Sequence, residues 1–168
     1  MLIWLTGFMG SGKTTVGRSL SGRLGVPLVD TDAAIETRFG KTIPEIFAAE
    51  GEAQFRVLEG AVIAECARLG DAVVATGGGA VEEEANVELM LRSGRVIFLD
   101  GGFDVLRARV GDAATRPLFR DPELAERRYA QRRPAYGRCH LRVESKIDDT
   151  PAQVAERICA LLEDECAT

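Results

Sequence analysis

The glycine-rich stretch GFMGSGKTT, residues 7–15, directly follows the apolar run MLIWLT at the start of the chain. Its pattern is GxxxxGK[ST], and it stands between an expected strand and an expected helix that runs to about Leu24. Glycine loses more backbone freedom on folding than any other residue, so three glycines in nine positions indicate a loop whose backbone must approach something closely. The feature therefore limits the N-terminal part of the chain to a strand, a bare loop and a helix.

The residue types in this loop indicate a phosphate-binding site. The backbone N–H groups of such a loop point inward around the β-phosphate of a nucleotide, and the helix N-terminus adds partial positive charge. Lys13 can bridge β- and γ-phosphate oxygens, and the Thr14 hydroxyl can ligate Mg²⁺. We therefore expect ATP and Mg²⁺ as cofactors, with the nucleotide bound by Gly10, Ser11, Gly12, Lys13, Thr14 and Thr15. The complete motif in this context makes a merely structural glycine turn the weaker interpretation.

Five apolar runs rich in strand-forming residues alternate with segments of helical spacing. The runs are LIWLT, PLVD, AVVAT, VIFLD and HLRVE, and Thr150 followed by Pro151 marks the start of a final helix. Gly25 and Gly94 follow periodic segments, where we expect left-handed helix ends. Strands that alternate with helices predict a parallel sheet of about five strands with helices on both faces, a three-layer α/β fold.

Length and composition predict one soluble domain that spans residues 1–168. A net charge of −5 argues against a nucleic-acid partner, despite the arginines between Arg107 and Arg142. No run reaches the roughly 18 apolar residues of a membrane span and no signal peptide is visible, which predicts a cytoplasmic protein. Four scattered cysteines without metal-ligand spacing agree with free thiols there. No long apolar stripe demands a partner chain, so we expect a monomer.

Ligands of a parallel sheet bind beyond the carboxyl ends of its strands, and this rule selects further candidates. Asp30 and Asp32 close the second expected strand. At a spacing of two residues both can face the site, one toward Mg²⁺ through water and the other toward an attacking hydroxyl. The same pair could instead cap a helix. Gly77–Gly79 remove side chains from the end of the third strand, which indicates either a tight turn or a binding site.

Two arginines outside the glycine loop each allow a structural and a functional interpretation. Arg56 lies three residues before Glu59 on an expected helix, so the two form either a surface ion pair or a unit in which Glu59 orients Arg56 toward an anionic substrate. Arg116 lies in the small, polar segment VGDAATRPLF. That segment is either an ordinary exposed loop or part of a mobile lid, residues 110–122, that closes over ATP and excludes water.

Together these motifs resemble the shikimate kinases, small P-loop kinases with the nucleoside monophosphate kinase fold. The resemblance extends over nearly the whole chain, through GFMGSGKTTVGRSL, VDTDAAIETRFGKTIPEIF, GEAQFRVLE, TGGGAV, RPL, RRPAY and TPAQV. It implies ATP-dependent phosphorylation of the 3-hydroxyl of shikimate to shikimate 3-phosphate, in the pathway to chorismate and the aromatic amino acids. Gluconate kinases share the loop and the fold, but the DTD, FR and TGGG set is similar to the shikimate branch.

The resemblance also implies which residues bind the acceptor. Arg56 and Arg132 would hold the carboxylate of shikimate, and Gly78, within the stretch Gly77–Gly79, would contact it through its backbone. The neighbouring Arg133 is the alternative to Arg132, and the spacing to the following proline and tyrosine favours Arg132. The substrate-binding segment would cover about residues 32–60.

The remaining roles implied by the resemblance concern ATP and the phosphoryl transfer. Asp32 would grip a ring hydroxyl and act as the base, and Asp30 would meet Mg²⁺ through water beside Thr14. Arg109 would lie beside the adenine. The implied catalytic residues are Lys13, Asp32 and Arg116. One stretch departs from the pattern: KIDDTP is acidic where some relatives carry a basic or amide residue near the adenine.

Two alternatives to this function stay open on the sequence. One is another small-molecule kinase that acts on gluconate or a nucleoside monophosphate. The other is a non-catalytic module in which ATP binding switches a partner interface. A switch needs no acceptor site, so Asp32, Arg56 and Arg132 argue against it.

Overall fold

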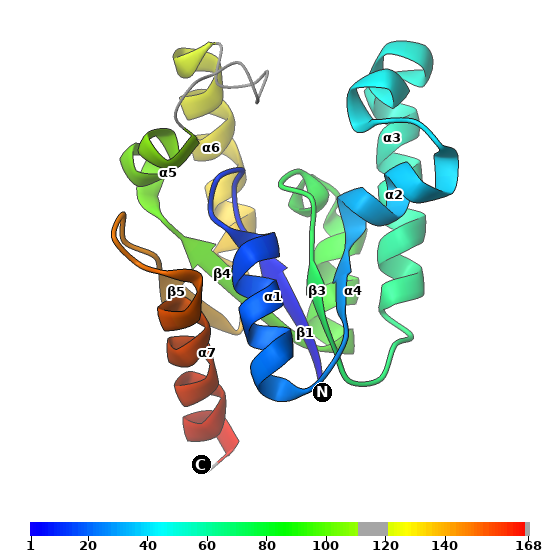
Figure 1. The fold of residues 1–168 in the computed structure, drawn as a ribbon. Helices are drawn as coiled ribbons and strands as arrows, with labels where there is room; N and C mark the ends of the chain where they lie inside the picture. The colour runs from blue at the N-terminus through cyan, green and yellow to red at the C-terminus, as the bar shows by residue number, and fades with distance from the viewer. Residues whose placement is uncertain (111–120, 167–168) are drawn as a thin grey trace.

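The computed structural model describes residues 1–110 and 121–166 (Figure 1). The strands are β1 Leu2–Thr6, β2 Leu28–Asp30, β3 Ala72–Ala75, β4 Arg95–Asp100 and β5 Leu141–Glu144. The helices are α1 Lys13–Leu24, α2 Thr31–Phe39, α3 Ile43–Cys66, the short 3₁₀ helix η1 Ala80–Glu82, α4 Glu84–Ser93, α5 Gly102–Val110, α6 Pro122–Tyr136 and α7 Pro151–Cys166. No helix in the described part of the chain is both long and apolar enough to cross a membrane.

The five strands form one parallel sheet in the order β2-β3-β1-β4-β5. The central strand β1 pairs with β3 through Ile3 and Val73, and with β4 through Leu5 and Ile97. All five residues of β1 are buried, because helices cover both faces of the sheet (Figure 1). The prediction of a three-layer α/β fold with about five parallel strands is confirmed.

Two apolar clusters join the helices to the two faces of the sheet. Ile3 and Leu5 pack with residues of α1 and α7, the two helices in front of the sheet in Figure 1. Trp4 and Phe98 belong to the other cluster, which residues of α2 to α6 complete. Trp4 is fully buried, and its indole Nε1 donates a hydrogen bond to Ser93 Oγ at 3.1 Å. The alternation along β1 thus divides the core between two helical layers.

The helix boundaries confirm two of the predicted signals and correct a third. Thr150 caps α7 by accepting a hydrogen bond from the Gln153 backbone N–H at 3.3 Å. Gly25 ends α1 in the left-handed conformation, with φ 67°. The prediction for Gly94 is wrong, since this residue is extended, with φ −171°. Glycine is needed there for a different reason: a Cβ atom would lie less than 3.0 Å from the carbonyl oxygen of Leu2.

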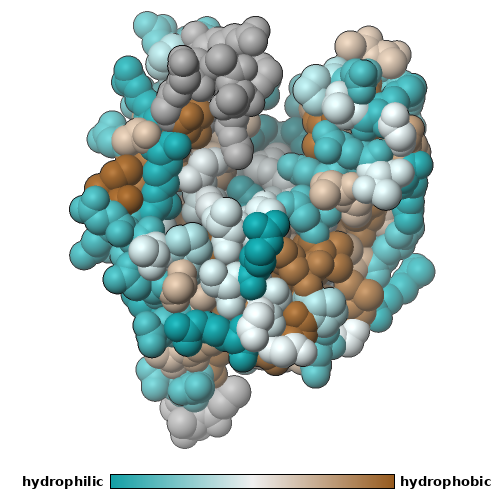
Figure 2. Space-filling model, in the orientation of Figure 1, coloured by the Kyte–Doolittle hydropathy of each residue, from teal (hydrophilic) through white to brown (hydrophobic). Residues whose placement is uncertain are grey.

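The carboxyl ends of β1, β2 and β3 lie at one edge of the sheet, where the glycine loop follows β1, Asp30 ends β2, and Gly77–Gly79 come just after β3. This is the edge at which parallel sheets bind ligands. Figure 2 shows the molecule hollowed there, between the side formed by α5 and α6 and the side formed by α2 and α3. The sheet order therefore gathers the candidate residues from separate segments into one cleft.

The two kinds of glycine in the fold predict opposite effects of alanine on stability. Gly94→Ala should lower the free energy of unfolding by about 1–3 kcal/mol, because its methyl group overlaps the backbone of β1. Gly22→Ala, at an exposed position of α1 with open space around the glycine, should raise it by up to about 1 kcal/mol through helix propensity. Urea unfolding of both variants measures the difference, and equal stability would contradict the close approach at Gly94.

Candidate active site

The loop between β1 and α1 has the backbone conformation that its glycines allow. Gly7, Gly10 and Gly12 have φ values of 146°, 83° and 86°, which side-chain-bearing residues rarely adopt. Gly12 precedes α1 without any side-chain cap, so the first N–H groups of the helix remain for a ligand. The Ser11 hydroxyl is buried and has no hydrogen-bond partner in the described structure. Bare N–H groups and this hydroxyl fit the phosphate groups of a nucleotide.

The two reactive side chains of the loop sit at the start of α1. Lys13 Nζ donates to the carbonyl oxygens of Gly7 at 2.7 Å and Phe8 at 3.0 Å, so the ammonium group lies over the loop. The Thr14 hydroxyl donates to Asp30 Oδ2 at 2.6 Å. A hydroxyl and a carboxylate side by side form the oxygen-rich donor set that Mg²⁺ prefers. The residues present therefore fit both a triphosphate and its metal.

Asp30 and Asp32 reach the cleft by a route that differs from the strand argument. β2 ends at Asp30, whose Oδ1 caps α2 by accepting from the backbone N–H groups of Asp32 and Ala33, both at 3.1 Å. Asp32 lies in the first turn of α2 and not on a strand. The expectation that both face the cleft by strand alternation is therefore wrong, although both line it, and Asp30 combines the cap with the contact to Thr14.

The cleft consists of adjoining cavities. The first, of about 530 Å³, is lined by Met9, Gly10, Gly12, Lys13, Thr14, Thr15, Asp30, Asp32, Thr76, Gly78, Arg109 and Val110. A smaller one of about 210 Å³ continues from the loop toward Arg109, Ser145 and Asp149. Arg109 Nη1 donates to Ser145 Oγ at 2.9 Å, and its Nη2 donates to the Lys146 carbonyl. The acidic KIDDTP stretch thus lies beside Arg109, the arginine expected near the adenine.

A further cavity of about 740 Å³ lies on the other side of Asp32. It is lined by Met9, Asp32, Ile43, Pro44, Phe47, Ala48, Glu52, Phe55, Arg56, Glu59, Gly77, Gly78, Gly79, Leu124, Arg128 and Arg132. Asp32 lines both this cavity and the one beside the glycine loop, as do Met9 and Gly78. A carboxylate therefore stands where the two cavities meet. We call the larger one the acceptor cavity.

The structure rules out one of the two interpretations of the Arg56–Glu59 spacing. Arg56 Nη1 donates to Glu59 Oε2 at 2.7 Å, and the Glu59 side chain is fully buried, so this is not a surface ion pair. Arg56 also contacts the carboxylates of Glu52 at 3.2 Å and Glu82 at 2.5 Å. Gly51, with φ 81° and ψ 168°, interrupts α3 just before this group. Arg56 is thus held at the cavity wall by three carboxylates.

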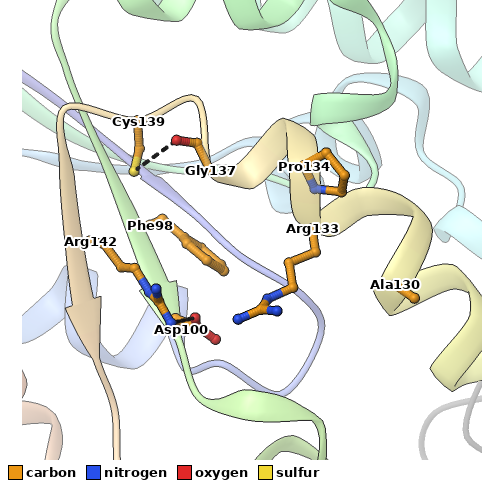
Figure 3. A pocket seen from close by; sticks show the side chains of 8 residues that line it. All are labelled: Phe98, Asp100, Ala130, Arg133, Pro134, Gly137, Cys139 and Arg142. Carbon is orange, nitrogen blue, oxygen red and sulfur yellow. Dashed lines mark hydrogen bonds and ion pairs between the residues drawn. The ribbon is translucent and has the colours of Figure 1, made fainter.

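Arg132 and Arg133 point to different cavities. Arg132 is buried, with 6% of its side chain exposed, and lines the acceptor cavity together with Arg56. Its guanidinium carbon lies 5.7 Å from the centre of the Phe8 ring, a cation–π distance. Figure 3 shows Arg133 at a separate cavity of about 600 Å³, where it points toward Phe98 and Asp100. Of the two, only Arg132 joins the residues that the sequence analysis assigned to the acceptor.

Gly77 and Gly79 have no room for side chains. A Cβ atom at Gly77 would lie 2.6 Å from both Asp32 Oδ1 and Glu59 Oε1, and one at Gly79 would overlap the Arg56 guanidinium. The Tyr136 hydroxyl, from the end of α6, donates to the Gly78 carbonyl at 2.5 Å. Of the two interpretations of these glycines, a tight turn or a binding site, the contacts support a tight turn. Gly77 and Gly79 allow it to pack closely against charged side chains that line the acceptor cavity.

Two carboxylates converge beneath this turn. Asp32 Oδ1 and Glu59 Oε1 both lie 2.6 Å from the same point above Gly77, so they are at most about 5 Å apart. Burial raises the pKa of Asp32, against the opposing charge of Lys13. Burial also raises the pKa of Glu59, and the ion pair with Arg56 opposes that change. The acceptor cavity therefore holds carboxyl groups that are harder to ionise than exposed ones.

One predicted part of the site is not described by the structure, and one residue of the site was not predicted. Arg116 and most of the predicted lid, residues 110–122, lie outside the described residues. Glu82, which contacts both Arg56 and Arg132, was not predicted as a site residue. In the sequence it is the first of three consecutive glutamates, a run typical of a solvated surface, and nothing there distinguishes it.

Comparison with known proteins identifies the family. The shikimate kinase family model matches residues 9–163. The chain belongs to the shikimate kinase family. It is 44% identical over 167 residues to the shikimate kinase of Symbiobacterium thermophilum, with 94% of this chain and 96% of that one covered. The solved shikimate kinase from Acinetobacter baumannii in complex with shikimate matches with a TM-score of 0.89 and 36% identity, over 98% of this chain and 93% of that chain.

These comparisons confirm the predicted P-loop kinase fold and the predicted family, and with it an enzyme of the shikimate kinase type. A gluconokinase from Sinorhizobium meliloti matches with a TM-score of 0.54 and 16% identity, which is a likeness of fold alone. The gluconate kinase alternative is thus supported by the fold alone, whereas the shikimate kinase family is supported by sequence identity over nearly the whole chain.

The raised pKa of Asp32 predicts how this residue affects stability. In the folded state Asp32 holds its proton more tightly than the unfolded chain does, so ionisation above the ordinary value of 3.8 opposes folding. Asp32→Asn should therefore have a higher free energy of unfolding than the wild type at pH 7, and the difference should disappear as the pH falls below 3.8. Urea unfolding at several pH values measures it. Asp148→Asn, at an exposed position, is the control, and an Asp32→Asn variant less stable than the wild type at pH 7 would contradict the sign.

Proposed function

We propose that this shikimate kinase transfers the γ-phosphoryl group of ATP to the 3-hydroxyl of shikimate, with residues of the two cavities in distinct roles. The observation that carries the assignment is the position of Asp32, which lines both the cavity beside the glycine loop and the acceptor cavity. A hydroxyl held in one cavity and a phosphate in the other would meet at this carboxylate. In-line transfer needs such an arrangement of two substrates more than it needs covalent chemistry from the protein.

The nucleotide side of the site binds and orients the triphosphate. The N–H groups of the loop from Gly10 to Thr15 would hold the β-phosphate, and Lys13 would move from the loop carbonyls to the β- and γ-oxygens. Mg²⁺, when bound, neutralises phosphate charge; Thr14 would ligate it, and Asp30 would hold it through water. Arg109 would lie beside the adenine, and the resemblance assigns Arg116 to the phosphates.

The acceptor side positions the ring acid. Residues 32–60, which include most of α2 and the first part of α3, would form the substrate-binding segment. Arg56 and Arg132, which we call the carboxylate clamp, would bind the carboxylate of shikimate, since guanidinium groups match carboxylates in geometry and charge. Gly78 would contact it through its backbone. A guanidinium pair at this position favours an anionic acceptor.

Asp32 would accept a hydrogen bond from the attacking hydroxyl and receive its proton. The raised pKa of Asp32 makes its carboxylate a better proton acceptor than an exposed aspartate. The charge of Lys13 opposes the rise in the pKa of Asp32 and so favours its ionised form. The base is therefore placed beside the cation that binds the phosphate to be transferred.

We further propose that the enzyme works as a monomer in the cytoplasm. Cys66, Cys139 and Cys159 are free thiols in the described structure, which agrees with a reducing compartment. The predicted absence of nucleic-acid and membrane partners stays a prediction.

A coupled assay of ADP release tests the function directly. With ATP and Mg²⁺, ADP release should require shikimate, and gluconate or nucleoside monophosphates should not replace it. Mass spectrometry of the product should show one added phosphoryl group. Turnover with gluconate or a nucleotide in place of shikimate would establish another small-molecule kinase, and tight ATP binding without turnover on any acceptor would support a nucleotide-dependent switch.

The carboxylate clamp predicts a specific kinetic defect. Arg56→Ala or Arg132→Ala should raise the KM for shikimate at least tenfold, because a hydrogen bond to a charged group contributes about 1.5–3 kcal/mol. The KM for ATP should stay nearly unchanged. Arg133→Ala is the matched control, since this neighbouring guanidinium lines a different cavity and should leave the KM for shikimate near the wild-type value. If Arg56→Ala and Arg132→Ala bind shikimate as tightly as the wild type and Arg133→Ala do, the clamp assignment is wrong.

A further inference from the structure

Glu82 contacts both arginines of the carboxylate clamp with one carboxylate. Its Oε2 lies 2.5 Å from Arg56 Nη2, and its Oε1 accepts a hydrogen bond from Arg132 Nε at 2.9 Å. Arg56 belongs to α3 and Arg132 to α6, which lie on opposite sides of the molecule as drawn in Figure 1. Glu82 therefore links two helices that are distant in sequence, at the point where both present a guanidinium group.

These contacts reach the clamp from outside the acceptor cavity. Arg56 and Arg132 are among the described residues that line the cavity, whereas Glu82 is not. The Glu82 side chain is 36% exposed, compared with 12% for Arg56 and 6% for Arg132. The carboxylate thus holds the two guanidinium groups without filling the space that they line.

The backbone around Glu82 is fixed, so its carboxylate has a defined place. The Glu82 N–H donates to the Gly79 carbonyl at 2.9 Å, within the glycine turn that follows β3. The Ala80 carbonyl accepts a hydrogen bond from the buried Asn86 side chain at 3.2 Å. Both α3 and α6 contact η1. The short helix therefore carries Glu82 on a support that touches both partners.

The two arginines depend on Glu82 to different degrees. Arg56 also pairs with Glu52 and Glu59, so it keeps two carboxylates without Glu82. For Arg132, the ion pair recorded among the described residues is the one with Glu82. Two neighbouring guanidinium groups repel each other when no anion lies between them. Loss of Glu82 should therefore release Arg132 first, and with it the spacing of the clamp.

We propose that Glu82 is a positioning residue that holds Arg56 and Arg132 at the separation at which both can bind a single substrate carboxylate. The inference rests on the proposed function, in which these arginines bind the carboxylate of shikimate. It adds a specificity device outside the cavity: one internal carboxylate, with one oxygen on each guanidinium, prepares the site for an external carboxylate on the other side.

Two substitutions separate the reach of Glu82 from its charge. Glu82→Gln keeps the length but loses the charge, and its amide oxygen can accept from only one side. Glu82→Asp keeps the charge but is one methylene shorter, so it cannot contact both arginines. Both variants should raise the KM for shikimate about tenfold. The clamp binds the carboxylate equally in the ground state and the transition state, so kcat and the KM for ATP should change less than twofold.

Comparison of two acceptors then tests the role itself. The wild type should prefer shikimate over its analogue with a hydroxymethyl group in place of the carboxylate. Both Glu82 variants should lose about tenfold of this preference, because the defect lies in carboxylate binding alone. Glu84→Gln is the matched control: it removes a surface ion pair with Arg138, just beyond α6, and should leave the preference unchanged. Circular dichroism and thermal unfolding verify that each variant folds.

The outcomes distinguish this inference from the proposed function. If Arg56→Ala and Arg132→Ala weaken shikimate binding but both Glu82 variants keep the wild-type preference, the clamp stands and the positioning role of Glu82 is wrong. A lower KM for shikimate in Glu82→Gln, with Glu82→Asp like the wild type, would mean that Glu82 merely competes with the substrate for the arginines by its charge. This outcome would also overturn the positioning role. If the arginine variants too bind shikimate normally, the proposed function of the clamp fails first.

Discussion

The site depends on the close approach of two glycine loops at the carboxyl ends of β1 and β3. A methyl group on Gly78 would make ordinary van der Waals contacts with the Met9 backbone nitrogen at 3.4 Å and the Gly7 carbonyl oxygen at 3.6 Å, so the two loops lie side by side. This packing places the start of α1 beside the Gly77–Gly79 turn. The glycine loop and the wall of the acceptor cavity are thereby parts of one edge of the sheet, and the side chains that converge on it depend on its geometry.

Around that edge, charges balance one another at short range. Arg56 contacts three carboxylates, Arg132 shares one of them, and Lys13 lies near Asp32. Unpaired charges in such partly buried surroundings would be costly, so the ligand-free site holds its cations with internal anions. Binding of an acid and a triphosphate must work within this balance. An anionic acceptor is favoured because the guanidinium groups are already oriented, and their hydrogen bonds to a charged group are stronger than those to a neutral sugar hydroxyl.

Prediction from the sequence was most successful where a residue's role depends on its neighbours along the chain. The GxxxxGK[ST] pattern predicted strand, loop and helix, because positive φ values at Gly7 and Gly12 and the helix start at Lys13 are local properties. Prediction failed where the conformation of a residue depends on contacts distant in the sequence or on where a short strand ends. Gly94 is extended and lies against β1, and Asp32 is on a helix because Asp30 caps α2 immediately after a three-residue strand. The spacing of apolar residues along the chain does not reveal a contact with a distant strand, and a strand of three residues is too short to show a clear period.

The sequence by itself determined the family, the α/β fold and the phosphate-binding loop, because alternating apolar runs and a contiguous motif fix these within short stretches of chain. Only the tertiary structure decided which of two adjacent arginines faces the acceptor cavity, that Glu59 is buried, and that Glu82 joins the arginines of α3 and α6. These facts depend on the sheet order, which brings separate helices to one edge. A run of three glutamates looks the same in sequence whether it faces water or two guanidinium groups, and packing alone makes the difference.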